Sequence, residues 1–196
     1  MEQHRYFILN KPYDMVSQFV SAHELKLLGD IAFQFPEGTH ALGRLDKNSE
    51  GMLLLTTNKK ITRLLFQGKI PHTRKYLLQV NGIVDEITLV KLRTGVTIHI
   101  KGDIDYQTKP CDISIVTPPE NLFSSGYMLH ERVPNTWLEI TLTEGKFHQI
   151  RKMLAAVRHP CKRLIRTAIE HIELDGLLPG EIREISETDF FEKLKL

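Results

Sequence analysis

The residues best placed for chemistry lie in a polar, turn-forming segment, residues 40–51, directly before the apolar run Met52–Leu55. In an extended backbone, the side chains of Arg44 and Asp46 point to the same side, so they can pair. A guanidinium beside a carboxylate keeps it ionised at neutral pH, which is the state that a nucleophile or a general base needs. The same pair would also brace a loop, and this segment alone favours that structural interpretation.

A second carboxylate, Glu50, follows Asp46 by four residues. Paired carboxylates on either side of a glycosidic bond are typical of glycoside hydrolases. Gly51 follows at once, however, so Glu50 more simply accepts hydrogen bonds from the amides of its own turn. The sequence therefore disfavours a glycosidase pair.

A tyrosine on an alternating strand is the next candidate. Tyr76 shares a strand face with Leu78 and Val80, as core tyrosines commonly do. Arg74 and Lys75 directly precede it, so the ring could instead stack on a nucleic-acid base while the two cations contact phosphates. Both interpretations stay open on these residues.

A basic helix is expected over residues 146–158. His148 has no matching set of His, Cys or Asp at ligand spacing, so no metal site is predicted. Arg151 is either a solvated helix charge or a functional cation, and Lys152 lies beside it, off the apolar stripe. That stripe is predicted to comprise Phe147, Ile150, Leu154 and Val157, at 3,4,3 spacing.

Short strands must position these candidates. Strands are predicted at residues 5–9, 52–57, 75–80, 96–104, 112–117, 137–143, 164–174 and 182–185. Helices are predicted at residues 61–66, 146–158, from Asp85 through Arg93, and after Ser186, with a loop over residues 118–127. Strands outnumber helices and come in hairpin-like runs, which favours an α+β fold with a large mixed sheet.

Basic residues are concentrated in two segments, although 26 Lys and Arg against 24 Asp and Glu leave the chain at only +2. Residues 59–75 hold six bases and no acid, and residues 144–166 hold seven bases and one acid. If these segments fold onto one face, they form a footprint for a polyanion. Solvated helix surface is the alternative for either segment alone.

Composition excludes several classes. The 196 residues, 41% hydrophobic and 26% charged, suit one large domain or two small subdomains. Apolar runs of about four residues are far too short to cross a bilayer, and the N-terminus lacks the apolar segment of a secretory signal. Cys111 and Cys161 form no disulfide framework or zinc knuckle, and no phosphate-binding glycine loop is present. A cytoplasmic, soluble protein is predicted.

Five motifs in order resemble the RNA pseudouridine synthases of the small-subunit rRNA type. They are Asn10-Lys11-Pro12, then Gly43-Arg44-Leu45-Asp46 with residues 49–51 and 53–58, then Lys75-Tyr76, residues 144–153, and residues 174–181. The resemblance spans residues 6–185. Ser17-Gln18-Phe19 and His130-Glu131-Arg132 look most like the branch of the large-subunit rRNA pseudouridine synthase E.

The resemblance implies an α+β pseudouridine synthase fold, in which a mixed, mostly antiparallel sheet is bisected by a basic catalytic cleft between two subdomains. It implies a single catalytic domain over residues 1–196. Many relatives carry a small S4-like RNA-binding domain before the catalytic one. Because the Asn10 motif begins near the N-terminus, that domain is expected to be absent here.

The resemblance also implies the reaction. A uridine in ribosomal RNA, most closely 23S rRNA, is detached at its glycosidic bond, rotated and rejoined through C5, without cofactor or metal. Asp46 carries over as the catalytic aspartate, Tyr76 as the residue that stacks on the base and serves the C5 proton, and Arg151 as the cation paired to Asp46. Whether Asp46 attacks C1′ or takes a proton from C2′ stays open.

A monomer that binds large-subunit rRNA is expected. The residues expected to contact RNA are Arg44, Lys11, Lys75, Arg74, Lys152 and His148.

Two other classes remain as alternatives. A non-catalytic RNA-binding protein could keep this fold, but binding alone needs no carboxylate in a cleft made for phosphates. An enzyme acting on small nucleosides could also cleave glycosidic bonds, but it would have no use for basic segments, because a nucleoside has no phosphate chain. Release of free base from nucleosides would favour the latter.

Overall fold

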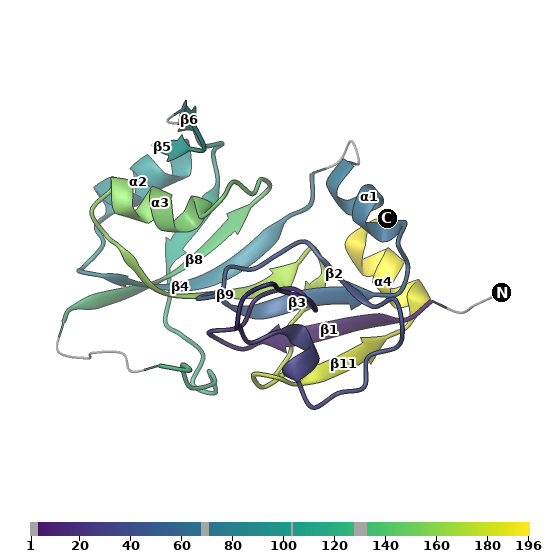
Figure 1. Cartoon of the computed structure of the whole chain (residues 1–196). Helices are drawn as coiled ribbons and strands as arrows, with labels where there is room; N and C mark the ends of the chain where they lie inside the picture. The colour runs from purple at the N-terminus through teal and green to yellow at the C-terminus, as the bar shows by residue number, and fades with distance from the viewer. Residues whose placement is uncertain (1–3, 68–70, 103, 128–132) are drawn as a thin grey trace. The chain divides into compact units, whose positions relative to one another are not determined.

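The computed structural model describes residues 4–67, 71–102, 104–127 and 133–196 (Figure 1). Two compact units make up the chain: Met1–His72 with Ile165–Leu196, and Thr73–Leu164. The boundary falls inside strand β9 (Cys161–Ile169). The second unit is therefore an insertion between the two halves of the first.

The first unit is built around strand β1 (Tyr6–Lys11), which pairs antiparallel with β11 (Ile182–Ile185) and with β3 (Glu50–Thr56). The short strand β2 (His40–Leu42) pairs antiparallel with β3. All residues of β1 and β3 are buried, which explains why both strands are almost continuously apolar rather than alternating.

One parallel pair makes this sheet mixed. β3 runs parallel to β9 through Glu50 opposite Ile165 and Gly51 opposite Arg166. β9 then returns antiparallel into β10 (Ile172–Glu173). The predicted mixed, mostly antiparallel sheet is confirmed.

Both faces of β1 are packed. On one face, Phe7 and Leu9 join a core cluster with Leu28 of the 3-10 helix η1 (Leu28–Asp30). Tyr6 instead packs against Phe190 of helix α4 (Glu187–Leu194), with 4.5 Å between ring centroids. Helix α1 (Ile61–Gln67) also belongs to this unit.

The second unit has an antiparallel sheet of β4 (Arg74–Asn81), β8 (Asn135–Leu142) and β7 (Asp112–Ile115). Its core cluster joins these strands to α2 (Glu86–Thr94), α3 (Gln149–Ala156) and the hairpin of β5 (Thr97–Ile100) and β6 (Ile104–Gln107) (Figure 1). As predicted, Leu138, Ile140 and Leu142 alternate into this core.

The predicted helix caps are confirmed. The Asp85 carboxylate accepts the Thr88 N–H at 2.8 Å, and Gly95 ends α2. The Ser186 hydroxyl accepts the Asp189 N–H at 3.1 Å and starts α4.

Three predictions about local structure were wrong, and one strand was missed. In place of one strand over residues 96–104, β5 and β6 pair as an antiparallel hairpin, and residues 164–174 form β9 and β10, which a turn at Glu170 separates. The helix predicted over residues 146–158 is confined to Gln149–Ala156, and strand β2 was not predicted.

The motif His130-Glu131-Arg132 lies outside the described residues, as does Gly68, near which the helix over residues 61–66 is predicted to end. Residues 118–127 contain no helix or strand, as predicted. No helix in the described ranges has the length and apolar character needed to cross a bilayer.

Candidate active site

In the first unit, the backbone around Asp46 is fixed by the side chain of Ser17. The buried Ser17 hydroxyl accepts the N–H of Leu45 and donates to the carbonyl of the same residue, each at 2.9 Å. On the other side, the Ser49 N–H donates to the Asp46 carbonyl at 3.0 Å. The half-buried Asp46 therefore projects from a segment that is hydrogen-bonded on both sides.

Lys11 is a buried cation at the end of β1. Its ammonium donates to the carbonyls of Pro12 at 2.8 Å and Met15 at 2.7 Å. Burial lowers the pKa of Lys11 to about 8, and the nearby carboxylates of Glu50 and Asp46 oppose that shift. Because the side chain is fully buried, the RNA contact predicted for Lys11 lacks an accessible ammonium in this structure.

Gly51 closes the Asp46 segment and leads it into the sheet. Its φ is +100°, and a Cβ at this position would lie 2.3 Å from the backbone oxygen of Arg166 on β9. Only glycine allows β3 and β9 to approach so closely here. Glu50, the first residue of β3, is 1% exposed.

Arg44 is exposed, and its guanidinium donates to the side-chain oxygen of Gln18 at 3.4 Å. The pairing of Arg44 with Asp46 stays a prediction. An exposed guanidinium on this segment is suited to a phosphate contact.

In the second unit, Tyr76 lies on β4 opposite Ile140. Its half-buried ring packs against the core cluster that contains Leu78 and Val80, as the strand pattern predicted. Lys75 points to the other face, where its ammonium lies 3.5 Å from Glu139.

Arg151 is the candidate cation on α3. One of its terminal nitrogens donates to the Cys161 carbonyl at 3.3 Å, which ties the side chain to the start of β9. Ile150, Met153 and Leu154 are buried and anchor the helix beneath it. His148 caps α3 in a left-handed conformation, with φ of 53°.

The predicted site residues fall into two groups. Asp46, Arg44 and Lys11 belong to the first unit, and the rest, Tyr76, Arg74, Lys75, His148, Arg151 and Lys152, belong to the second. Because the expected pairing of Asp46 with Arg151 joins residues of different units, it stays a prediction. The sequence did not reveal the role of Ser17, since its hydroxyl acts on a residue 28 positions away.

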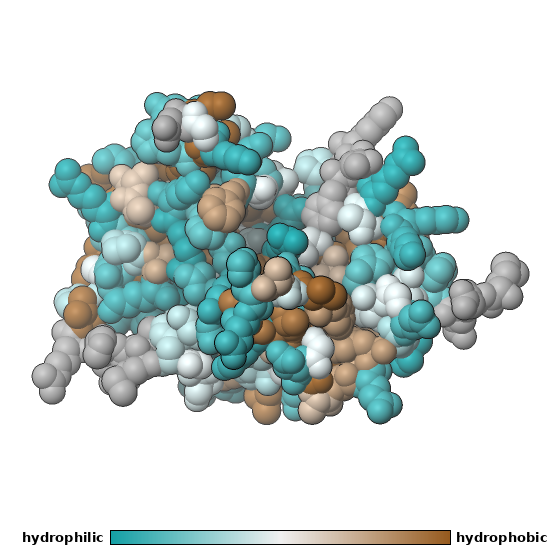
Figure 2. Space-filling model, viewed as in Figure 1, coloured by the Kyte–Doolittle hydropathy of each residue, from teal (hydrophilic) through white to brown (hydrophobic). Residues whose placement is uncertain are grey.

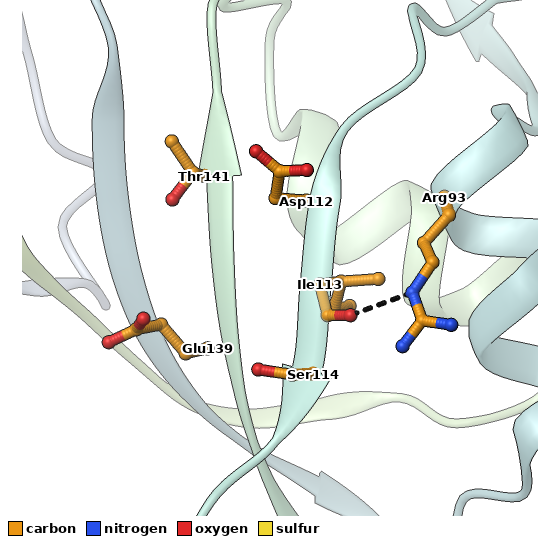
Figure 3. Close-up of a pocket in the computed structure, with 6 residues that line it drawn as sticks. All are labelled: Arg93, Asp112, Ile113, Ser114, Glu139 and Thr141. Atoms are coloured by element: carbon orange, nitrogen blue, oxygen red, sulfur yellow. Dashed lines mark hydrogen bonds between the residues drawn. The ribbon is translucent and has the colours of Figure 1, made fainter.

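A shallow hollow of about 160 Å³ lies at the β7 edge of the second unit (Figure 3). Arg93 reaches into it and donates from Nε to the Ile113 carbonyl at 3.0 Å, which covers part of an open strand edge. The hollow contains none of the predicted site residues, and Asp112 and Glu139 give it carboxylates unsuited to a polyanion. Across the described ranges, no cluster of three or more His, Cys, Asp or Glu side chains is arranged to hold a metal ion.

Comparison with solved structures shows which known proteins share this fold. A crystal structure described as a pseudouridylate synthase superposes with a TM-score of 0.78 at 26% identity, over 99% of this chain and 75% of that one. The human RNA pseudouridylate synthase domain containing 1 shares the fold at a TM-score of 0.59 and 17% identity, over 99% of this chain and 84% of that one.

Sequence comparison gives the same family. The sequence model of the RNA pseudouridylate synthases matches residues 5–156. The ribosomal large subunit pseudouridine synthase E of Vibrio vulnificus is 36% identical over 95% of this chain and 77% of its own length. The protein of that name from Xanthomonas axonopodis pv. citri is 35% identical over 88% of this chain and 89% of its own length. The ribosomal small subunit pseudouridine synthase A of Escherichia coli is 29% identical over 96% and 74%. This chain belongs to the RNA pseudouridine synthase family, and it is an isomerase of that class.

Proposed function

We propose that this chain converts a uridine of large-subunit ribosomal RNA to pseudouridine, with Asp46 as the catalytic aspartate. The observation that carries the choice of substrate is the 36% identity, over 95% of this chain, to a ribosomal large subunit pseudouridine synthase E. The similarity to the Xanthomonas protein of that name supports the same choice.

The reaction rearranges one nucleotide without gain or loss of atoms. The bond from N1 to C1′ breaks, a bond from C5 to C1′ forms, a proton leaves C5, and N1 gains a proton. Nothing is oxidised or reduced, so the chemistry needs only a nucleophile or base, a group that handles the C5 proton, and a pocket that holds the rotating base.

Asp46 must be ionised to begin this reaction, whether it attacks C1′ or takes the C2′ proton. The hydrogen bonds at Leu45 and Ser49 support this role because they fix the backbone that carries the carboxylate. The ammonium of Lys11 interacts favourably with the Asp46 charge in the first unit. Arg151 is proposed to add the second cation.

Tyr76 is proposed to hold the flipped base and to handle the C5 proton. Extruding a base from a folded RNA costs a few kcal/mol, which stacking on an aromatic ring and contacts to phosphate offset. Arg74, two residues before Tyr76 and on the same face of β4, supports such contacts.

The small-subunit rRNA is the second candidate substrate. The 29% identity to the small subunit pseudouridine synthase A of Escherichia coli covers 96% of this chain, so that similarity is as extensive although weaker. The two candidates differ only in the RNA, and one experiment separates them.

The test is deletion of the gene, followed by mapping of pseudouridine across both host rRNAs and complementation with variants. We expect one site to be missing from 23S rRNA, restored by the wild type and by Asp105→Asn, an exposed carboxylate on β6, and not by Asp46→Asn. A missing 16S site would favour the second candidate. Restoration by Asp46→Asn would overturn the catalytic assignment, because an amide is neither a nucleophile nor a base at neutral pH.

A further inference from the structure

Phe147 occupies an unexpected position at the start of α3. The apolar pattern predicts it inside the core, yet it precedes the helix and its side chain is 70% exposed. Figure 2 shows hydrophobic residues interrupting a mainly hydrophilic surface on the face in view, so exposure alone is unremarkable. What sets Phe147 apart is how its loop is held and what surrounds its ring.

The loop is held by the buried side chain of Gln149. Its amide oxygen accepts the Lys146 N–H at 2.8 Å, and its amide nitrogen donates to Glu144 at 2.6 Å. The Glu144 carboxylate also accepts the Lys109 N–H at 3.0 Å and the hydroxyl of Tyr106. Hydrogen bonds thus fix residues 144–149 at both ends of the loop. The outward position of Phe147 therefore results from an ordered loop and not from a frayed helix end.

Cationic and aromatic groups surround the ring. The His148 ring stacks on that of Phe147, with centroids 3.8 Å apart and planes 19° apart. The Lys152 ammonium lies 5.3 Å from the Phe147 centroid. Glu144, the only acid of residues 144–166, already accepts three hydrogen bonds. Phe147 nevertheless remains 70% exposed, and an accessible aromatic side chain with an ammonium over its ring matches the two parts of a nucleotide, its base and its phosphate.

We propose that Phe147 is a stacking platform for an unpaired base of the substrate RNA, distinct from the target uridine, with Lys152 contacting the phosphate of that nucleotide. The inference rests on the proposed function, since it assumes an RNA substrate. A protein partner would also use an exposed aromatic residue. The Lys152 ammonium over the ring favours RNA, and the target uridine is assigned to Tyr76 on β4.

The test measures the affinity of the full chain for a 23S rRNA transcript over a series of salt concentrations. Phe147→Ala and Phe147→Leu should weaken binding about five- to 150-fold, whereas Phe147→Trp should stay within about twofold of the wild type. Losing a stacked base should leave the slope of log affinity against log salt unchanged. Lys152→Ala should reduce the magnitude of that slope by about one.

Ile87→Ala is the matched control. Ile87 is 68% exposed on α2, beside Asp85 and Glu86, and its removal should not change RNA affinity. Melting temperatures of the Phe147 and Ile87 variants should agree with that of the wild type because both side chains are largely exposed. Ile87→Ala should also keep the wild-type turnover rate, since Ile87 belongs to none of the residues assigned to catalysis or RNA binding.

The proposal that Phe147 stacks on a base would be wrong if Phe147→Ala bound RNA with wild-type affinity. The same holds for Phe147→Leu, because leucine has no aromatic ring. A defect seen on ribosomal particles but not on naked transcript would assign Phe147 to a protein contact instead. If the Phe147 prediction fails while the wild type still modifies rRNA, the proposed function stands. If the wild type neither binds nor modifies 23S or 16S rRNA, both proposals are wrong.

Discussion

Ser17 and Leu45 form a reciprocal pair in which one hydroxyl satisfies both backbone polar groups of its partner, each at 2.9 Å. Leu45 immediately precedes the catalytic candidate Asp46. Both partners are buried, so water cannot replace the hydroxyl if it is removed. We therefore propose that Ser17 is a positioning residue, which acts on the reaction through the backbone that carries Asp46.

Ser17→Ala should lower the free energy of unfolding by about 2 kcal/mol, because it leaves a buried N–H and a buried carbonyl unpaired. It should also reduce kcat with little change in KM for RNA, since Asp46 loses its orientation while the RNA-binding surface is kept. Denaturant unfolding and single-turnover kinetics measure the two effects. Ser17→Thr keeps a hydroxyl and should recover most of the activity. Ser21→Ala, near the surface, is the control; a purely structural role for Ser17 would leave kcat at the wild-type value.

Gly51→Ala should destabilise the protein by about 3 kcal/mol or more, because the added Cβ meets the backbone of Arg166 and the φ of +100° disfavours any side chain. Gly38→Ala provides the comparison: its φ is +77°, but nothing lies within 4 Å of the added Cβ. That variant should lose only about 1 kcal/mol. Equal losses in thermal unfolding would show that the close approach of β3 and β9 does not limit this position.

Tyr76→Phe should retain RNA affinity and lose turnover by about 100-fold or more, since the ring still stacks but the hydroxyl that handles the proton is gone. Binding and single-turnover assays on the same RNA measure the difference. Tyr127→Phe is the control, because its hydroxyl donates to the Lys162 carbonyl in a structural bond at 2.7 Å. Full turnover in Tyr76→Phe would reduce Tyr76 to a packing residue.

Lys11 should make stability depend on pH in the alkaline range. Its pKa falls from 10.5 in the unfolded chain to about 8 in the folded protein. Between these values the unfolded chain binds more protons than the folded one, so the contribution of Lys11 to stability rises as pH increases from about 8 to 10. The free energy of unfolding of the wild type, minus that of Lys11→Met, should therefore increase over this range by up to about 3 kcal/mol. A constant difference from pH 7 to 10 would contradict the lowered pKa.

Arg63→Ala should weaken rRNA binding and reduce the magnitude of the salt slope by about one, if the exposed Arg63 on α1 contacts a phosphate. Lys193→Ala removes another exposed cation, from α4, in residues 170–196, where acidic residues outnumber basic ones, and should change neither quantity. An unchanged slope for Arg63→Ala would return the segment of residues 59–75 to ordinary solvated surface.

Local signals predicted much of the fold, and longer-range contacts account for what they missed. Asp85 and Ser186 cap helices through bonds within three residues, so sequence spacing was sufficient to find them. The break between β9 and β10 occurs at Glu170, whose φ of 48° is uncommon for a residue other than glycine. Phe147 matched the helical period, but the hydrogen bonds of Gln149 begin the helix after it.

The candidate site also contains residues that the sequence indicated and residues whose roles it did not indicate. Asp46, Tyr76 and Arg151 were chosen from motifs, which record the side chains that a reaction needs. Ser17 acts on a residue 28 positions away. Lys11 donates to carbonyls only one and four residues on, but neither spacing nor charge indicated that its side chain would be buried. Sequence reasoning thus names candidates for the chemistry more readily than the residues that hold them in place.

Because the second unit is inserted within the first, the ribosome makes the two halves of the first unit at separate times. β1 is complete long before β11, its neighbour through the pair Tyr6 and Ile185, and residues 73–164 are made in between. At about 5–20 residues per second, roughly 10 to 35 seconds pass between completion of β1 and synthesis of β11. During that interval one hydrophobic edge of β1 has no strand to pair with, so the nascent chain is most exposed to aggregation, and most in need of a chaperone, at this edge.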